Sequence, residues 1–404
     1  MKRIFALLLA FAMVFTLAAC GGKTEEPATT TAEAPATTAA PATTEAPATT
    51  EAPAATEAPA EPAAADISVA MITDYGDITD QSFNQTTYEA CKEYCEANGI
   101  EFNYFKPASD SDDDRVAMIE KAIDEGFTVI VTPGYAFANA LKATAGDNSD
   151  VKFVAIDVSA GDFGDGYTLP ENLYSAVYQE ELCGYMAGYA AVKLGYTKLG
   201  YLGGMAVPAV VRYGYGFLQG ADAAAAELGV DVECNYAYGN QFFGDADITA
   251  AMDVWYQAGT ECVFACGGGI FTSAAEAAAK VGGKVIGVDV DQAPTIDGLY
   301  GEGMTVTSAM KGLAPTTKAQ LAAIVDGSFK GGQIETLGLI SANPEENYVQ
   351  IPASTQFDDN FTADDYAALV ADMFGGKVTV SNDITKAAAD VVSTITVNDQ
   401  GNIK

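Results

Sequence analysis

The feature that most restricts the fold is an alternation of short apolar runs with longer helix-like stretches, which starts near Asp66 and continues to Asp289. The apolar runs, expected to be strands, lie at 67–73, 102–105, 129–132, 153–157, 198–202, 232–236, 262–265 and 285–289. The expected helices lie at 81–98, 112–125, 136–145, 173–194, 210–228, 248–258 and 273–281. Apolar strands between helices indicate parallel sheets that are covered on both faces. Since a single sheet would need about ten strands, we expect an α/β protein with two doubly wound lobes.

Acidic residues and glycines stand just after several of these expected strands. Asp74 follows the first strand, Asp157 ends the fourth and Asp289 ends the last, while glycines follow two others at 203–204 and 267–269. In open parallel sheets, ligands bind beyond the carboxyl ends of the strands. We therefore expect a cleft at this edge that accepts hydroxyl or amine donors.

The first twenty residues have the pattern of an export signal. Lys2 and Arg3 precede an apolar stretch at 4–15 that is too short to span a bilayer, and Leu-Ala-Ala-Cys follows at 17–20. This ending resembles the lipobox of bacterial lipoproteins, in which the cysteine is acylated and becomes the mature N-terminus. Residues 1–19 are therefore expected to be a signal peptide. Acylated Cys20 is expected to anchor the protein to the cell membrane, facing the extracytoplasmic side.

A low-complexity segment follows this cysteine. From Thr24 to Ala65 every residue is Ala, Thr, Glu or Pro. No aromatic or branched aliphatic side chain is available there to offset the entropy of ordering the chain. Residues 20–65 are therefore expected to be the lipidated cysteine with a disordered linker, and residues 66–404 the folded domain.

The composition excludes several classes of function. The chain has 404 residues, with 20 Lys and Arg against 55 Asp and Glu, and it has no histidine. Because affinity for a phosphate backbone comes mainly from basic side chains, no nucleic-acid partner is expected. The lack of histidine removes Ser-His-Asp triads, Cys-His pairs and His metal sites. The six cysteines besides Cys20 match neither a zinc site nor a Cys-x-x-Cys pair, so buried apolar thiols are expected, with a disulfide as the alternative.

Four motifs carry a resemblance to a known family. They are Asp-Gln-Ser-Phe-Asn-Gln at 80–85, Gly-Gly-Met-Ala-Val-Pro at 203–208 running into Tyr-Gly-Tyr-Gly-Phe-Leu-Gln-Gly at 213–220, Gly-Val-Asp-Val-Asp-Gln at 287–292, and Thr-Ser-Ala-Met-Lys at 307–311. In this order they resemble the basic membrane protein, or PnrA-like, family of substrate-binding lipoproteins. The resemblance implies a type I periplasmic-binding-protein fold, in which two Rossmann-like lobes joined by a hinge close on a ligand in the cleft. It places the first lobe at about 66–175 plus a later segment, and the second at about 176–300 plus the C-terminal segment.

The resemblance also implies ligand-binding roles. Asp74 and Asn84 resemble polar contacts of the first loop, and Phe83 resembles an aromatic residue that stacks on a base. The other matches are Phe243 as the second stacking face, Gly268 as a backbone contact, Asp289 as the ribose-hydroxyl acceptor, Lys311 as its basic partner, and Asp157, which matches less closely. Phe242 competes with Phe243 for the stacking role. Asn139 stands where the family often has an acidic residue, which leaves the base preference open.

Each of these residues has an ordinary structural alternative. Phe83 would be the first core residue of its helix, and Asp74 a turn residue. Lys311 is expected to open a helical stretch, where a cation is unfavourable against the helix dipole unless it has a partner, so its position favours a functional role. Arg212 is expected either to pair with an acid across the mouth of the cleft or to lie on the surface. The acidic run at 110–115 lacks the glycine and glutamate of a calcium loop, so it is expected to cap a helix rather than to hold a metal.

The expected function is that of a binding protein rather than an enzyme. The resemblance implies a monomeric receptor that captures a purine nucleoside, such as adenosine, guanosine or inosine, and delivers it to the permease of an ABC importer, with no cofactor. Two alternatives stay open: the same fold with riboflavin or another ring-plus-polyol ligand, and an exported nucleoside-processing enzyme.

Overall fold

The computed structural model describes residues 67–74 and 76–404. The expected signal peptide at 1–19, the acylated Cys20 and the linker at 20–65 lie outside the described residues and stay predictions. Among the described helices, none is both long enough and apolar enough to cross a lipid bilayer.

Six parallel strands form the first sheet, in the order β11-β5-β4-β3-β1-β2. They are β1 (Ser68–Ile72), β2 (Glu101–Phe105), β3 (Val129–Pro133), β4 (Lys152–Ile156), β5 (Leu173–Tyr178) and β11 (Gln333–Leu337). Their helices are α1 (Phe83–Asn98), α2 (Asp112–Asp124), α3 (Ala138–Thr144), α4 (Ala160–Phe163) and α10 (Leu313–Val325). We call this sheet with its helices lobe 1. Every residue of β3 is buried, as expected for a central parallel strand.

The second sheet has the order β12-β10-β9-β8-β6-β7-β13, and only β12 is antiparallel to its neighbour. Its strands are β6 (Lys198–Gly203), β7 (Glu233–Tyr238), β8 (Cys262–Cys266), β9 (Lys284–Asp289), β10 (Thr305–Lys311), β12 (Val349–Gln350) and β13 (Thr396–Asn402). Its helices are α5 (Glu180–Lys193), α6 (Pro208–Leu228), α7 (Ala246–Gln257), α8 (Phe271–Ala279), α9 (Ala293–Tyr300) and α11 (Ala363–Phe374). We call this sheet with its helices lobe 2.

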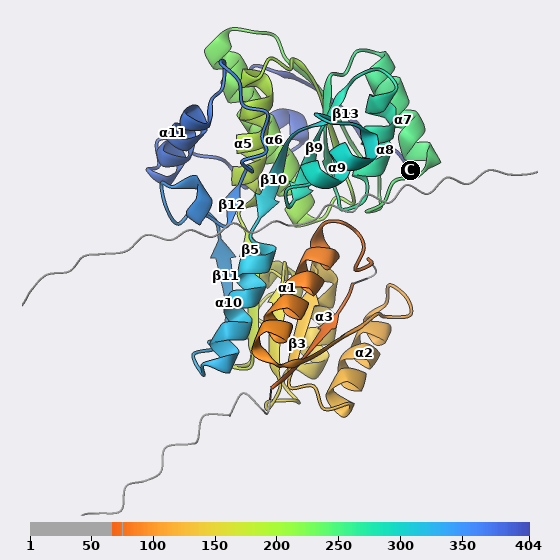
Figure 1. The fold of residues 1–404 in the computed structure, drawn as a ribbon, viewed down its shortest axis with the longest axis vertical. Helices are drawn as coiled ribbons and strands as arrows, with labels where there is room; N and C mark the ends of the chain where they lie inside the picture. The colour runs from red at the N-terminus through yellow and green to blue at the C-terminus, as the bar shows by residue number, and fades with distance from the viewer. Residues whose placement is uncertain (1–66, 75) are drawn as a thin grey trace, which may run out of the picture. The chain divides into compact units, whose positions relative to one another are not determined.

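In the described chain the polypeptide passes between the lobes three times: from β5 to α5, from β10 to α10, and from β11 to β12. These strands meet where the two lobes join (Figure 1). Segments that cross between two lobes are the places where a hinge acts. The lobe limits expected from the sequence, near residues 175 and 300, fall inside β5 and just before β10.

Glycines bring α5 and α6 of lobe 2 close together. A Cβ atom on Gly188 would lie 2.0 Å from the carbonyl oxygen of Phe217, and one on Gly220 would lie 2.0 Å from that of Tyr185. Any larger side chain would push the helix backbones apart. The close packing also brings the start of α5 against α6, where the Nε of Arg212 donates to Glu180 at 2.7 Å.

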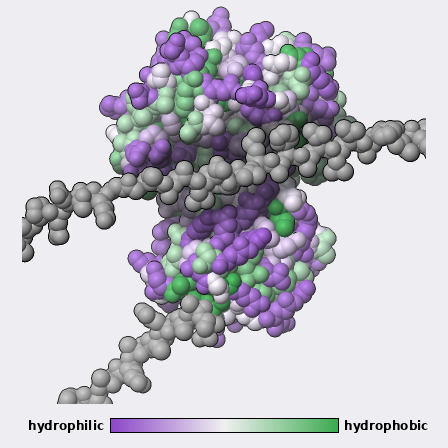
Figure 2. Space-filling view, in the orientation of Figure 1, coloured by the Kyte–Doolittle hydropathy of each residue, from purple (hydrophilic) through white to green (hydrophobic). Residues whose placement is uncertain are grey.

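Apolar side chains fill the interior, and polar ones cover the outside. Between the second sheet and α6 lie the buried rings of Tyr201, Phe217, Tyr236 and Phe264, with Tyr201 stacked on Tyr236 at a ring-centroid distance of 4.6 Å. Hydrophilic residues cover most of the visible surface of both lobes (Figure 2), in keeping with the many acidic groups of the sequence.

Two local expectations from the sequence are confirmed. The run at 110–115 caps α2, because the Oγ of Ser111 accepts the N–H of Asp114 at 3.1 Å. The cysteines of the described chain are free and buried: Cys91, Cys95, Cys183, Cys234, Cys262 and Cys266.

Two others are wrong. Residues 173–194 are not one helix, because β5 ends at Tyr178 and α5 begins at Glu180. β5 lies between β4 and β11 and is buried almost throughout. Its sequence therefore lacks the alternation of apolar and polar residues that would distinguish a strand from a helix. Lys311 does not open a helix: it is the last residue of β10, and α10 begins at Leu313.

Candidate functional site

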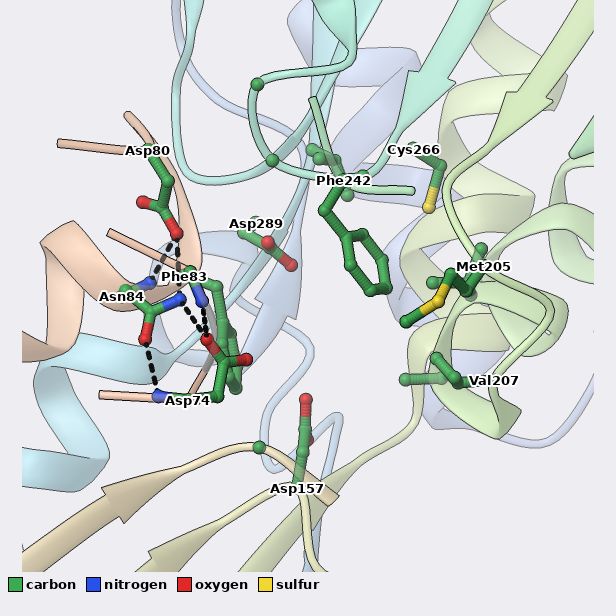
Figure 3. A pocket seen from close by; sticks show the side chains of 18 of the residues that line it. Asp74, Asp80, Phe83, Asn84, Asp157, Met205, Val207, Phe242, Cys266 and Asp289 are labelled. Carbon is green, nitrogen blue, oxygen red and sulfur yellow. Dashed lines mark hydrogen bonds between the residues drawn. The ribbon is translucent and has the colours of Figure 1, made fainter. Parts of the chain in front are cut away.

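A cavity of about 670 Å³ lies at the carboxyl ends of the strands of both lobes. Loops after β1, β3 and β4 line it from lobe 1, and loops after β6, β7 and β8 line it from lobe 2. In Figure 3, Asp74, Asp80 and Asn84 lie on one side and Met205 and Val207 on the other. The cavity lining includes all eight predicted ligand-binding residues: Asp74, Phe83, Asn84, Asp157, Phe243, Gly268, Asp289 and Lys311. The structure thus brings them together, and their contact with a ligand stays a prediction.

Backbone strain is concentrated at this cavity. Among the described residues, four other than glycine adopt a left-handed φ: Gln81 (57°), Asp157 (60°), Asn240 (57°) and Asp289 (66°). All four line the cavity. Such conformations cost on the order of 1 to 3 kcal/mol each and cluster at functional sites. The clustering supports this cavity as the candidate functional site, independently of any sequence motif.

The loop after β1 holds a half-buried carboxylate against an amide. The Nδ2 of Asn84 donates to the Oδ1 of Asp74 at 3.0 Å, and the N–H of Gly76 donates to the same oxygen at 2.5 Å. Asp80 orients the start of α1 by accepting the N–H groups of Ser82 at 3.0 Å and Asn84 at 2.8 Å. Burial raises the pKa of Asp74 to about 6. The Nδ2 of Asn84 also donates to the Oδ2 of Asp80 at 3.1 Å, so both of its protons are taken and the pair offers the carboxylate of Asp74 as an acceptor at the wall of the cavity.

Lys311 is the cation at the centre of the second polar cluster. Its ammonium donates to the Oδ2 of Asp157 and lies 3.6 Å from both Glu180 Oε1 and Asp289 Oδ1. Burial by itself lowers the pKa of Lys311, but the carboxylates of Asp157, Asp289 and Glu180 raise it above its usual value. The lysine is therefore protonated. It also connects the lobes, because Asp157 follows β4 in lobe 1 and Lys311 ends β10 in lobe 2.

The two aspartates beside Lys311 differ in how their oxygens are occupied. The Oδ2 of Asp289 accepts the hydroxyl of Ser82 at 2.6 Å, and its Oδ1 accepts the hydroxyl of Tyr213 at 3.1 Å. The Oδ1 of Asp157 is buried and has no hydrogen-bond partner in the described part of the chain. Burial raises the pKa of Asp157 to about 6, against the opposing effect of Lys311. A buried acceptor of this kind is costly until a donor reaches it, so Asp157 offers a ready contact for a ligand hydroxyl.

Phe83 serves both the core and the cavity. It is half-buried, packs against the core and begins α1, as its structural alternative expected. It also lines the cavity, where the ammonium of Lys311 lies 4.7 Å from the centroid of its ring. The ammonium and the aromatic ring attract each other, which holds the ring in place.

Two neighbouring phenylalanines follow β7, and they are placed differently. Phe242 points into the cavity (Figure 3), whereas the side chain of Phe243 is 61% exposed, although it also lines the cavity. Gly268 has a φ of 55°, and a Cβ atom there would lie 3.3 Å from the carbonyl oxygen of Phe242. The geometry favours Phe242 for a stacking contact, while the role of Phe243 stays a prediction.

Several groups that complete the site were missed at the level of sequence. Ser82 and Tyr213 bind Asp289, and both lie within motifs that carry the family resemblance, so the motifs held the signal. Glu180 joins Lys311 to Arg212, but it lies in the segment expected to be the interior of a long helix. Arg212 does pair with an acid, but that acid, Glu180, lies in the same lobe rather than across the mouth of the cleft.

Comparison with other proteins gives the same fold. A solute-binding protein of an ABC transporter system from Conexibacter woesei superposes with a TM-score of 0.62 at 22% identity, covering 78% of this chain and 99% of that one. Its likeness shows the fold, and the fold is that of type I periplasmic solute-binding proteins.

Curated relatives match in sequence. An ABC transporter nucleoside-binding protein BmpA of Lactococcus lactis is 28% identical over 336 residues, covering 78% of this chain and 89% of the relative. An uncharacterized lipoprotein of Pyrococcus abyssi is 26% identical over 286 residues, covering 68% of each. A family model described as "ABC transporter substrate-binding protein PnrA-like" matches residues 67–364. Because this match covers most of the chain, the protein belongs to the PnrA-like, or Bmp, family of ABC transporter substrate-binding proteins.

Proposed function

We propose that the cavity binds a purine nucleoside, which the protein delivers to the permease of an ABC importer without changing it chemically. The observation that carries the proposal is the set of groups around the cavity: aromatic rings for a flat base, and carboxylates for hydroxyl groups. The L. lactis relative, which is named as nucleoside-binding, supports this choice of ligand.

The charges of the cavity favour an uncharged ligand. Seven aspartates and three cations line it. Each of these cations pairs with a carboxylate: Lys106 with Asp77 at 2.8 Å, Arg212 with Glu180 at 2.7 Å, and Lys311 with Asp157. A phosphate group would therefore meet an excess of negative charge and would have to displace an existing partner. This argues for a nucleoside rather than a nucleotide.

The two polar clusters suit the two halves of a nucleoside. Phe83 and Phe242 supply aromatic surface, and stacking on such rings contributes about 1 to 3 kcal/mol per base. The carboxylate of Asp74, which Asn84 holds in place, provides an acceptor for the donor groups at the edge of a base. Asp157 and Asp289 suit the ribose, because a carboxylate accepts two hydroxyl donors. A volume of about 670 Å³ lies within the range of sites for small ligands.

A binding panel tests this function. Adenosine, guanosine, inosine, cytidine, AMP, ribose and riboflavin are each added to the purified protein, and the melting temperature is measured. A ligand at one hundred times its dissociation constant stabilises the fold by about 2.7 kcal/mol. We expect stabilisation by purine nucleosides and none by AMP or ribose. Stabilisation by riboflavin alone would show that the ligand is another ring-plus-polyol compound and not a nucleoside. Release of free base during incubation would show that the protein is an enzyme and not a receptor.

Attachment to the membrane is part of the proposal. The Leu-Ala-Ala-Cys motif at 17–20 and the P. abyssi relative, which is named as a lipoprotein, support acylation of Cys20 and an extracytoplasmic location. Cys20→Ser should leave an unprocessed precursor or release soluble protein in a detergent-partition assay. Recovery of an acylated variant in the detergent phase would refute this mode of anchoring.

A further inference from the structure

The strand β13 reaches the edge of the cavity from outside the matched family region. The family model ends at residue 364, whereas β13 runs beside β7 in parallel, from Thr396 opposite Glu233 to Asn402 opposite Tyr238. Since parallel strands end at the same edge of a sheet, β13 finishes where the loop after β7 begins. We call residues 239–245 the β7 loop; five of them line the cavity, namely Asn240, Gln241, Phe242, Phe243 and Gly244.

Residues just after β13 hold the far end of this loop. The Nζ of Lys404 donates to the Oδ2 of Asp245 and to the Oε1 of Gln241, the latter at 3.3 Å. The Nε2 of Gln241 donates to the same Oδ2 at 3.0 Å and to the carbonyl of Phe243 at 2.8 Å. The other oxygen of Asp245 caps α7 by accepting the N–H of Ile248 at 3.0 Å. Asp245 therefore joins the helix, the β7 loop and Lys404.

Phe242 packs against the core, but packing contributes little to fixing the residues on either side of it. Phe243 is largely exposed, and Asn240 has a strained φ of 57°. A backbone bridge between Phe243 and Gly269 fixes one side of the loop. On the other side lies the Lys404–Asp245–Gln241 network. Lys404 as a whole is exposed, but the side chains of both charged residues are partly covered, with exposures of 29% for Lys404 and 28% for Asp245.

We propose that Lys404, presented by β13, is a positioning residue for the β7 loop and thereby sets the affinity of the cavity for its ligand. The inference rests on the proposed function for the identity of the ligand. The positioning itself concerns the ligand-free protein, so it is measured separately.

The test compares four variants. Lys404→Met and Asp245→Asn both remove the ion pair. Asparagine is also a good helix cap, so Asp245→Asn keeps the cap of α7. Lys404→Arg keeps the positive charge. Lys377→Met is the control. Lys377 follows α11 and forms an ion pair with Asp372 of that helix, and it does not contact the β7 loop. Amide hydrogen exchange of residues 239–245 is measured without ligand, and adenosine affinity is measured by calorimetry.

We expect Lys404→Met and Asp245→Asn to raise exchange in the loop and to weaken adenosine binding by about two- to fivefold, as loss of a partly buried ion pair implies. Lys404→Arg and Lys377→Met should match the parent in both measurements. Unchanged exchange would overturn the positioning role. Faster exchange with unchanged affinity would overturn its effect on the ligand. If the parent does not bind adenosine, the proposed ligand fails, while the exchange result still decides the positioning role.

The single tryptophan reports whether β13 stays docked in these variants. Trp255 is buried, and its Nε1 donates to the Oε1 of Gln400 in β13 at 3.1 Å. Its emission should be unchanged in Lys404→Met and shifted to longer wavelength after removal of residues 396–404. A red shift in Lys404→Met would mean that the whole strand has detached, and it would refute a role confined to Lys404.

Discussion

At the scale of single residues, the Lys311 cluster shows how one buried cation gives two carboxylates different tasks. Asp289 is already occupied by two hydroxyl groups, and one of them, from Ser82, comes from the opposite lobe. Asp157 shares Lys311 but keeps one buried oxygen without a partner in the described chain. A ligand hydroxyl would gain more at Asp157, since it would satisfy an acceptor rather than replace an existing donor. The family resemblance instead favours Asp289 over Asp157 as the ribose contact. A sequence motif gives the residue types, but it does not show which oxygen atoms already accept hydrogen bonds.

We therefore expect Asp157 to recognise ribose hydroxyls. Asp157→Ala should weaken adenosine binding by about 1.5 to 3 kcal/mol, the range for a hydrogen bond to a charged group. Removing the 2′-hydroxyl or the 3′-hydroxyl from the ligand should weaken binding to the variant less than it weakens binding to the parent. Calorimetry measures both changes in binding free energy. Asp77→Ala is the control, because Asp77 is an exposed carboxylate of the same cavity. Equal losses in parent and variant for both deoxynucleosides would assign the hydroxyls to another residue.

The raised pKa of Asp74 predicts how stability depends on pH. Its value of about 6, against 3.8 ordinarily, means that the folded protein holds this proton more tightly than the unfolded chain does. The contribution to the free energy of unfolding is therefore greatest below about pH 4 and falls as the pH rises towards 6. Asn at this position does not ionise and keeps the acceptor for Asn84. Relative to the parent, Asp74→Asn should gain stability between pH 4 and pH 7, by up to about 3 kcal/mol.

Urea unfolding at pH 4, 5.5 and 7 measures this difference. Asp77→Asn is the matched control, because the hydrogen bond from Lys106 lowers the pKa of Asp77 and reverses the expected sign. A difference between Asp74→Asn and the parent that does not change with pH would show that Asp74 is not the group that titrates.

At the scale of elements, the sequence predicts most strands and helices up to Asp289, because their apolar runs are short and end at glycines or acids. It fails at β5, whose two apolar faces hide the boundary with α5. It also fails at β10, where Lys311 ends a strand rather than opening a helix. Both failures fall on segments that cross between the lobes. Glu180 and Lys311 are buried there because they pair with opposite charges. Hydrophobic periodicity does not reveal a charged residue that is buried in this way.

The contact between α5 and α6 gives a prediction at the same scale. Gly188→Ala places a methyl group 2.0 Å from the carbonyl oxygen of Phe217, so the two helices must separate. We expect a loss of about 1 to 3 kcal/mol in the free energy of unfolding, measured with denaturant. Gly298→Ala in α9 is the control, since its Cβ atom meets nothing within 4 Å and alanine favours a helix. Equal stability of the two variants would mean that the helix contact is not close-packed.

At the scale of the whole binding domain, the three crossings and the cavity between the lobes lead us to expect that the lobes close on a ligand. The side-chain contacts that join the lobes at the cavity include the Lys311–Asp157 ion pair, the hydroxyl of Ser82 donating to Asp289, and the Nε2 of Gln292 donating to the carbonyl of Gln81 at 3.1 Å. Hydrogen bonds of this kind contribute about 0.5 to 1.5 kcal/mol each, and somewhat more when one partner is charged. Such contacts bias the lobes towards closure, while a ligand that touches both lobes supplies the larger part of the driving force.

Ser82→Ala tests this division of roles. It removes one contact of the closed state, so ligand affinity should fall by about 1 kcal/mol, because part of the binding energy must then be used to close the lobes. Ser354→Ala is the control: its hydroxyl donates to Asp291 at 2.8 Å, but both residues belong to lobe 2. Small-angle scattering should show a smaller radius of gyration with saturating nucleoside in the parent and in both variants, since the ligand still bridges the lobes. If the parent did not become more compact with a ligand that calorimetry shows to be bound, the lobes would not close on it, and the Ser82–Asp289 bond would be a fixed structural contact.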